Sequence, residues 1–199
     1  MPISHSLGMT TPRNYVHVMT APALLTAEDL AQVRLPDKRT ELVRGHMVVR
    51  EPAGFRHGDI AMTIALAIGQ FLRGHGSGRL LAAETGFVLA TDPDTVRAPD
   101  VAFVRHERIP DPAPRGYARF APDLVVEVLS PDDRPGEVQE KVADWLKAGT
   151  HLVWVIDPDR RTAHVYRSDG TDRLLSASDE LDGEDLLIGL TCPLGEVLR

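Results

Sequence analysis

The sequence predicts an α/β or α+β sandwich, in which a helix precedes a mixed sheet and a crossover helix follows its central strand. Three observations predict it. Residues 57–72 carry apolar side chains at helical spacing, and residues 124–129 form the almost continuous apolar run that is typical of a central strand. A second helical segment at 136–148 follows this run and precedes two strand-like segments, 151–157 and 162–167, as expected for a crossover connection.

The length and composition indicate one domain. The chain has 199 residues, of which 43% are hydrophobic, which is enough for one sizeable core. We expect residues 1–23, which are polar and contain prolines, to be poorly ordered, and residues 24–199 to form a single domain. No apolar stretch approaches the roughly 18 residues of a membrane span. The first residues show no basic region followed by an apolar run, so nothing in them argues for secretion. We therefore expect a cytoplasmic protein without a membrane partner.

Charge and cysteine content exclude two classes of protein. The net charge of −7 argues against a protein that coats nucleic acid by charge alone, although an enzyme with a local basic patch remains possible. The single cysteine, Cys192, cannot form an internal disulfide or a cysteine metal cluster.

The first elements are short. Thr26 resembles an N-cap, with Asp29 completing a pattern like a capping box, and together they predict a helix over residues 26–33. Residues 41–50 carry β-branched side chains around Gly45 and predict a strand, a turn and a strand.

The middle of the chain predicts the clearest helix, over residues 57–72, followed by a glycine-rich break at 73–79 that is read as a linker. Residues 80–90 and 101–106 are expected to be strands of a hairpin, separated by the turn-rich segment 91–94. Further on, Gly149 is expected to end the helix 136–148 as its C′ residue, while residues 174–199 show no clear pattern.

Glu127 is the most informative residue, because it places a carboxylate in the middle of the apolar strand 124–129. A buried, unpaired charge is costly, so this side chain must be protonated, paired or bound to a cation. Pairing with an arginine is the structural alternative.

Asp100 stands at the entrance of the strand that begins at Val101, and it is the second candidate acid. Taken alone, Pro99-Asp100 is a common turn dipeptide. Together with Glu127, however, it can converge on a hard cation such as Mg²⁺, which prefers carboxylates and water. Such an ion would polarise a phosphoryl oxygen and lower the pKa of an attacking water.

Lys141 borders the apolar face of the helix 136–148, whereas Lys147 falls on the opposite side. A lysine in the first position can lay its stem over the core and direct its ammonium toward the sheet edge. Simple snorkelling explains the same position equally well.

These residues belong to a set of motifs in a characteristic order: Glu41-Leu42-Val43-Arg44-Gly45, His57, Arg97-Ala98-Pro99-Asp100-Val101, Val126-Glu127-Val128-Leu129-Ser130-Pro131, Lys141, Ala148-Gly149 and Val153-Trp154-Val155-Ile156-Asp157-Pro158. With them the chain resembles the Uma-two family, a branch of the PD-(D/E)XK restriction-endonuclease-like superfamily. The resemblance covers roughly residues 24–195.

The resemblance implies a restriction-endonuclease-like core, in which a mixed central sheet is flanked by helices. It also implies Asp100 and Glu127 as ligands of Mg²⁺ or Mn²⁺. One departure concerns the lysine that the superfamily places two residues after the second acid, because Leu129 stands there. The resemblance implies that Lys141 replaces it. Glu41 matches the family pattern Glu-Leu-x-x-Gly and is a further candidate acid; pairing with an arginine is its alternative.

His57 falls on the same helix face as Ile60 and Ile64, so a core or capping role is favoured over a catalytic one. The leading hypothesis is a metal-dependent endonuclease acting on DNA, with Asp100, Glu127, Lys141 and Glu41 as its catalytic residues. The alternatives are a catalytically weak or inactive binding or regulatory module, and hydrolysis of another phosphoester. A homodimer would suit cutting both strands, although no residue specifies one.

Overall fold

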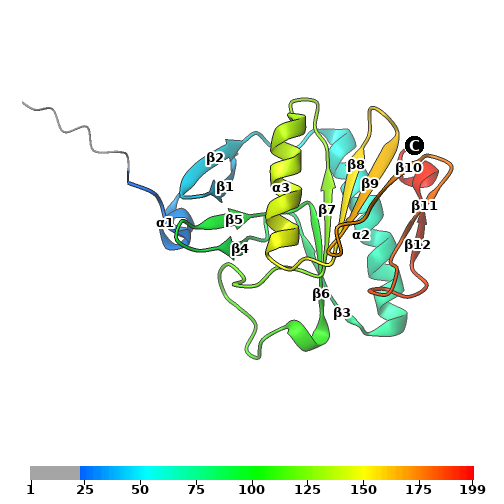
Figure 1. Ribbon diagram of the computed structural model, residues 1–199, viewed down its shortest axis with the longest axis horizontal. Helices are drawn as coiled ribbons and strands as arrows, with labels where there is room; N and C mark the ends of the chain where they lie inside the picture. The colour runs from blue at the N-terminus through cyan, green and yellow to red at the C-terminus, as the bar shows by residue number, and fades with distance from the viewer. Residues whose placement is uncertain (1–22) are drawn as a thin grey trace, which may run out of the picture.

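The computed structural model describes residues 23–199. Residues 1–22 of the segment expected to be poorly ordered lie outside the described residues. Most of the described strands form two sheets, shown in Figure 1. The smaller sheet has the order β2-β1-β5-β4, with β1 at Arg39–Val43, β2 at His46–Arg50, β4 at Phe87–Ala90 and β5 at Thr95–Arg97.

The larger sheet has six strands in the order β10-β9-β8-β7-β6-β3. They are β3 at Gly78–Ala82, β6 at Val101–Arg105, β7 at Leu124–Val128, β8 at Leu152–Asp157, β9 at Thr162–Arg167 and β10 at Asp172–Ser176. Strand β7 is parallel to β8 and antiparallel to β6, so the sheet is mixed. The interior position of β7 confirms the central strand that its apolar run predicts.

Helices cover both faces of this sheet. Helix α2, Phe55–His75, packs Ile60, Ile64 and Ile68 against one face, and helix α3, Pro135–Lys147, packs Val142 and Trp145 against the other. Figure 1 shows α3 crossing one face of the sheet and α2 behind it. The alternation of β7 sends even-numbered residues from 124 to 128 toward α2, so Glu127 lies on the α3 face.

Local signals account for the ends of several elements. The Thr26 side chain accepts from Asp29 N and the Asp29 carboxylate accepts from Thr26 N, which confirms the capping box of α1, Ala27–Gln32. Helix α3 begins one residue before its expected start, with Pro135 at its first position. Gly149 follows the C-cap residue Ala148 at φ +100°, which confirms it as the expected C′ residue.

The chain passes from the smaller sheet to the larger one through a very short segment. Strand β5 ends at Arg97, and only Ala98, Pro99 and Asp100 separate it from β6. Because Asp100 N donates to Val126 O, this segment lies against the edge of β7. The junction of the two sheets therefore stands beside Glu127.

The expected hairpin between residues 80–90 and 101–106 is wrong. A turn that includes Glu84, at φ +68°, divides the first segment into β3 and β4. Strand β3 pairs with β6 in the larger sheet, whereas β4 pairs with β5 across the turn 91–94. Local turn chemistry predicted the turn, but it could not show that β5 intervenes between the two segments.

Three further boundaries differ from the expectation. Helix α2 extends to His75, and Gly78 is the first residue of β3, so the glycine-rich segment is not a free linker. The C-terminal residues, for which no pattern was found, form β10, a ribbon of β11 at Glu180–Asp182 and β12 at Thr191–Pro193, and helix α4 at Leu194–Val197. No helix within residues 23–199 is long and apolar enough to cross a membrane.

Candidate active site

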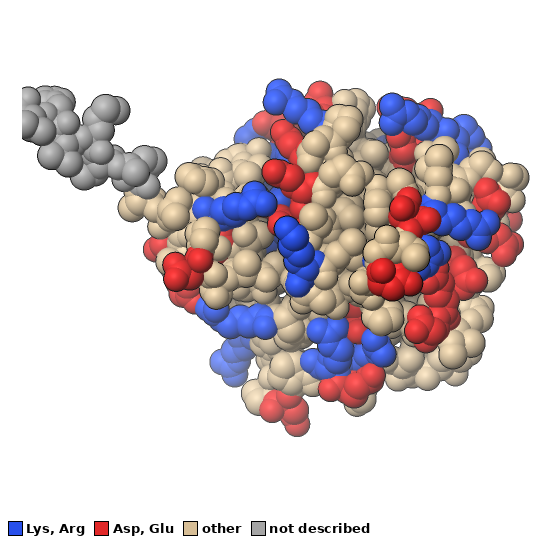
Figure 2. All heavy atoms as spheres, in the orientation of Figure 1, with Lys and Arg blue, Asp and Glu red and all other residues tan. Residues whose placement is uncertain are grey.

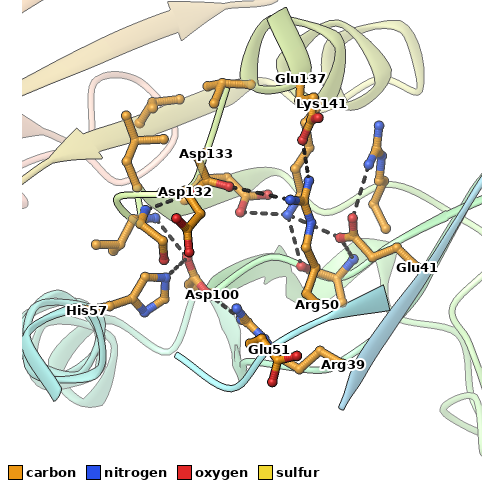
Figure 3. A pocket seen from close by; sticks show the side chains of 18 of the residues that line it. Arg39, Glu41, Arg50, Glu51, His57, Asp100, Asp132, Asp133, Glu137 and Lys141 are labelled. Atoms are coloured by element: carbon orange, nitrogen blue, oxygen red, sulfur yellow. Dashed lines mark hydrogen bonds and ion pairs between the residues drawn. The ribbon is translucent and has the colours of Figure 1, made fainter. Parts of the chain in front are cut away.

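A cavity of about 390 Å³ lies at the carboxyl end of β7, where the two sheets meet. All four predicted catalytic residues line it: Glu41 from β1, Asp100 from the junction, Glu127 from β7 and Lys141 from α3. Figure 3 shows Glu41 and Lys141 on one side of this cavity and Asp100 with His57 on the other. Residues separated by up to 100 positions in the chain are thus brought to one place.

Glu127 is buried, with 8% of its surface exposed, and both of its carboxylate oxygens are hydrogen-bonded. Oε2 accepts from Lys141 Nζ at 2.9 Å, and Oε1 accepts from the indole Nε1 of Trp145 at 2.9 Å. Since Lys141 and Trp145 are four residues apart on α3, they lie one above the other on the face turned to the sheet. One helix face therefore holds this carboxylate at two points.

Lys141 reaches the sheet edge, as its helical position predicts. Besides its bond to Glu127, its ammonium lies 3.1 Å from Glu41 Oε1 and donates to Ala98 O at 3.4 Å. Lys147, on the opposite side of the same helix, is exposed to solvent. The two lysines of α3 therefore have different surroundings, and only one of them contacts the candidate acids.

Glu41 makes contacts on both sides of its carboxylate. Oε1 also accepts from Ala98 N at 2.9 Å, and Oε2 accepts from Arg97 Nη1 at 3.0 Å. The pairing with an arginine that was an alternative for Glu41 thus exists together with its contact to Lys141. Arg97 is itself buried and uses Nε and Nη2 to bind Asp144 of α3 at 3.0 and 2.7 Å. It ties β1, β5 and α3 together behind the site.

Asp100 is bound from three elements. Its Oδ2 accepts from Val128 N at 2.8 Å and lies 3.1 Å from Nε2 of His57, near the start of α2. Its Oδ1 has a longer contact, 3.4 Å, with Arg39 of β1. His57 is buried as its position on the apolar face predicts, but it contacts the candidate metal ligand directly.

The electrostatics of the three acids differ. Burial raises the pKa of Glu127 to about 7, with the negative charges of Asp100 and Glu41 adding to the effect and Lys141 opposing it. Burial also opposes ionisation of Glu41, but Lys141 and Arg97 hold its pKa below the ordinary value. The pKa of Asp100 is likewise lowered against the effect of burial, chiefly by His57 and the Val128 amide. Negative charge at this site is therefore least well compensated at Glu127.

The donor set suits a small, hard cation. Eight acidic residues line the cavity, and three of them, Glu41, Asp100 and Glu127, are the candidate acids. Lys141 contacts two of these three, and Arg97 is shared between Glu41 and Asp144. Among residues 23–199, no three acidic, histidine or cysteine side chains are gathered as a protein-only metal cage. Mg²⁺ does not need one, since it usually keeps several waters and binds through one or two carboxylates and substrate phosphates. Asp100 and Glu127 fit that requirement.

Comparison with known proteins identifies the family of the chain and a solved structure with the same fold. The model of the Uma2 family, described as "Putative restriction endonuclease", matches residues 27–195. The chain belongs to the Uma2 family. A solved structure described as a "putative nuclease belonging to DUF820 from Anabaena variabilis ATCC 29413" superposes with a TM-score of 0.76 at 21% identity, over 87% of this chain and 97% of that chain. It shares the fold. No curated protein matches the chain.

Three residues of this Uma2 site were not identified from the sequence as participants. Arg97 gave no usable signal, because Val96 is the one apolar residue of the short strand β5, and the guanidinium is buried through its contacts with Glu41 and Asp144. Trp145 was assigned to the core by its helical position, which is correct for its ring but says nothing of its indole N–H. Arg39 approaches Asp100 only through the pairing of β1 with β5, which no local pattern reveals.

Proposed function

We propose that this Uma2 protein is a metal-dependent endonuclease that hydrolyses phosphodiester bonds in DNA. The observation that carries the proposal is the convergence of Glu41, Asp100, Glu127 and Lys141 on one cavity. Family membership supports the nuclease assignment, because the family is described as one of restriction endonucleases.

Asp100 and Glu127 would hold Mg²⁺ or Mn²⁺, with water and the substrate phosphate completing the shell. When bound, the ion supplies Lewis acidity to a phosphoryl oxygen and lowers the pKa of an attacking water. The protein's own task is to hold the two carboxylates in place. The Val128 amide and His57 do this for Asp100, and Trp145 does it for Glu127.

Lys141 supplies positive charge at the reacting phosphate. Its ammonium is held between Glu41 and Glu127, both of which raise its pKa although burial opposes them. A lysine kept protonated in this way orients a water or a phosphate oxygen by donating hydrogen bonds, and it stabilises negative charge that develops in the transition state. Glu41 fixes the direction of the ammonium, and Arg97 fixes Glu41.

The test is cleavage of supercoiled plasmid DNA with Mg²⁺ or Mn²⁺ by the parent protein and by Glu127→Ala. We expect cleavage by the parent that requires the added ion and is lost in the variant. Glu107→Ala, which changes an exposed glutamate of the 3-10 helix His106–Arg108, is the matched control and should cleave normally. Equal cleavage by both variants would overturn the assignment, since a contaminating nuclease responds to neither.

A second candidate function is a binding or regulatory module of the same fold with little or no catalysis. Figure 2 favours it in one respect, because basic and acidic side chains are interspersed on the face shown and form no continuous basic surface. The net charge of −7 also favours this second function over DNA cleavage. DNA binding without metal-dependent cleavage in the plasmid assay would select this function.

The proposal includes the cellular compartment and the oligomeric state of the protein. A cytoplasmic nuclease would meet its DNA substrate and Mg²⁺ in the same compartment, and a homodimer would present two such sites for cutting both strands. Analytical ultracentrifugation of the full chain measures the second point directly: a mass of twice 21.8 kDa is expected.

A further inference from the structure

A second cavity, of about 440 Å³, adjoins the first. It is bounded by α2, by the residues that follow β3, and by the segments on either side of the β1–β2 hairpin. Small and apolar residues form more than half of its lining, among them Ala53, Ala61, Met62, Ala65, Ala82 and Ala83, and charged residues such as Asp37, Lys38 and Glu84 complete it. Small side chains leave room for a flat group, and the volume lies within the range of about 300–1,000 Å³ found for small-molecule sites.

The two cavities share five lining residues: Arg39, Pro52, His57, Glu84 and Asp100. His57 and Arg39 each turn one nitrogen to the Asp100 carboxylate, Nε2 at 3.1 Å and Nη1 at 3.4 Å. The apolar cavity therefore begins at the side chains that hold the candidate metal ligand. A molecule with its phosphate at Asp100 would have its neighbouring atoms at the entrance of this second cavity.

The shared wall also has unmet hydrogen-bonding capacity. His57 Nδ1 and Arg39 Nε are buried, and neither has a hydrogen-bond partner among residues 23–199. Buried polar atoms without partners are rare in folded proteins, because each costs the free energy of its lost hydration. These two atoms expose almost no surface, so a ligand would meet them only after a small movement of the side chains. Asp37, Lys38 and Glu84 line the cavity directly, so a ligand with hydrogen-bonding groups on one edge and apolar faces would match it.

We propose that this second cavity binds one unstacked nucleobase of the DNA strand whose phosphate lies at Asp100 and Glu127. The proposal rests on the proposed function and adds the substrate class, since a base can enter such a cavity only from DNA that is single-stranded or locally unpaired. Extruding a base from a duplex requires it to be unpaired and unstacked, whereas a single strand avoids most of that cost.

The test measures binding, so it does not depend on catalysis. Fluorescence anisotropy, measured without divalent metal and again with Ca²⁺ to neutralise the carboxylates, compares a labelled single-stranded oligonucleotide with a series in which one nucleotide at a time is replaced by an abasic analogue. Loss of the bound base should weaken binding about tenfold or more at one position of the series, as for loss of one base contact in a single-strand binding protein.

Two variants of α2 identify the cavity as the cause. Met62 lines the second cavity, whereas Leu66, one turn further along the helix, lines neither cavity; their exposed fractions are similar, 58% and 53%. Met62→Asp and Leu66→Asp change the net charge equally. We expect the affinity ratio of intact to abasic strand to fall to about one in Met62→Asp and to stay at the parent value in Leu66→Asp. Met62→Ala, with a smaller reduction of the ratio, replaces Met62→Asp if that variant unfolds.

Three outcomes would overturn the proposal: no binding of any single strand at millimolar concentration, a ratio of one for the parent at every abasic position, or equal ratios in the two aspartate variants. These outcomes are separable from failure of the nuclease assignment. A protein that shows the expected ratios but cuts no plasmid keeps the base site and loses the nuclease function, and the converse result loses the base site alone.

Discussion

Two buried carboxylates lie near opposite ends of strand β7, Asp123 before it and Glu127 close to its last residue. Their negative charges are compensated to different extents. Asp123, just before the strand, accepts from the Arg105 amide, Arg105 Nε and Arg108 Nη1, each at 2.9 Å. Although burial opposes it, these donors lower the pKa of Asp123. About 13 Å along the strand, at 3.3 Å per residue, burial and neighbouring acids raise the pKa of Glu127 to about 7.

The difference separates a structural cluster from a candidate active site. At Asp123 two arginines serve one acid, so its charge is fully matched within the protein. At the other end Lys141 is shared by two acids, and Asp100 lies close enough to raise the pKa of Glu127 further. Burial alone therefore does not identify a functional carboxylate. A shortage of positive charge around a buried carboxylate is the better indicator, because a bound cation can supply that charge.

The largest expected effect is a loss of activity when Lys141, the charged partner of Glu127, is replaced. Lys141→Ala should lower the cleavage rate by about 10²- to 10³-fold, as for loss of a group that stabilises developing charge. Lys147→Ala, on the exposed side of the same helix, should change it little. Lys141→Arg keeps the charge but alters its shape, so it should recover only part of the rate. The measurement is the rate of plasmid nicking at saturating metal; equal effects of the two alanine variants would remove Lys141 from the site.

The next largest effect is a loss of stability when Asp123, the fully paired carboxylate, is replaced. Asp123→Asn should lower the free energy of unfolding by about 2 kcal/mol, less than the 3–5 kcal/mol typical of a broken buried pair, because Arg105 and Arg108 are 38% and 33% exposed and can be hydrated. Urea denaturation measures it. Asp185→Asn, at a carboxylate that is 79% exposed, is the control. A loss no greater than the control's would show that Asp123 is not a structural anchor.

The third expectation concerns pH. The pKa of Asp123 is lower in the folded protein than the unfolded value of about 3.9, so its contribution is complete above that value and is lost as the pH falls through the folded pKa. The stability gap between the parent and Asp123→Asn should therefore shrink below about pH 4. Urea midpoints from pH 6 to pH 2.5 give the gap directly, and a constant gap would contradict a charge-based role.

The smallest effect is expected at Glu127. Because the pKa of this acid is raised on folding, its charged form costs stability as the pH rises from its ordinary range through about 7. Glu127→Gln should thus be at least as stable as the parent at pH 8 without metal. Thermal unfolding should show stabilisation by Mg²⁺ or Mn²⁺ in the parent only. A large fall in metal-free melting temperature would mean that Glu127 is a structural ion-pair residue like Asp123.

The features that were correctly predicted from the sequence are those determined by residues close together in the chain. The capping box at Thr26, the helical face that begins at Ile60 and the apolar run of β7 are local patterns, and each is confirmed. Glu127 was found because its charge violates such a pattern. The place of Lys141 followed from helical geometry, and the structure puts its ammonium on Glu127, while its chemical role stays a prediction.

What the sequence could not predict depends on contacts between distant segments. The pairing of β3 with β6 joins residues across two intervening strands, and no local pattern specifies it. The Arg97 guanidinium acts through Glu41 and Asp144, which lie 56 and 47 residues away. His57 was correctly expected to be buried, but burial does not reveal that Asp100 is its partner.

The contact between a helix lysine and a strand carboxylate has a consequence for assembly. Leu129, which directly follows β7, lines the same cavity as Lys141, which belongs to the helix packed over the sheet. The ammonium of Lys141 can reach Glu127 only when α3 lies on the sheet. The buried carboxylate therefore gains its charged partner at the step in which helix and sheet come together, and not when the strand itself forms.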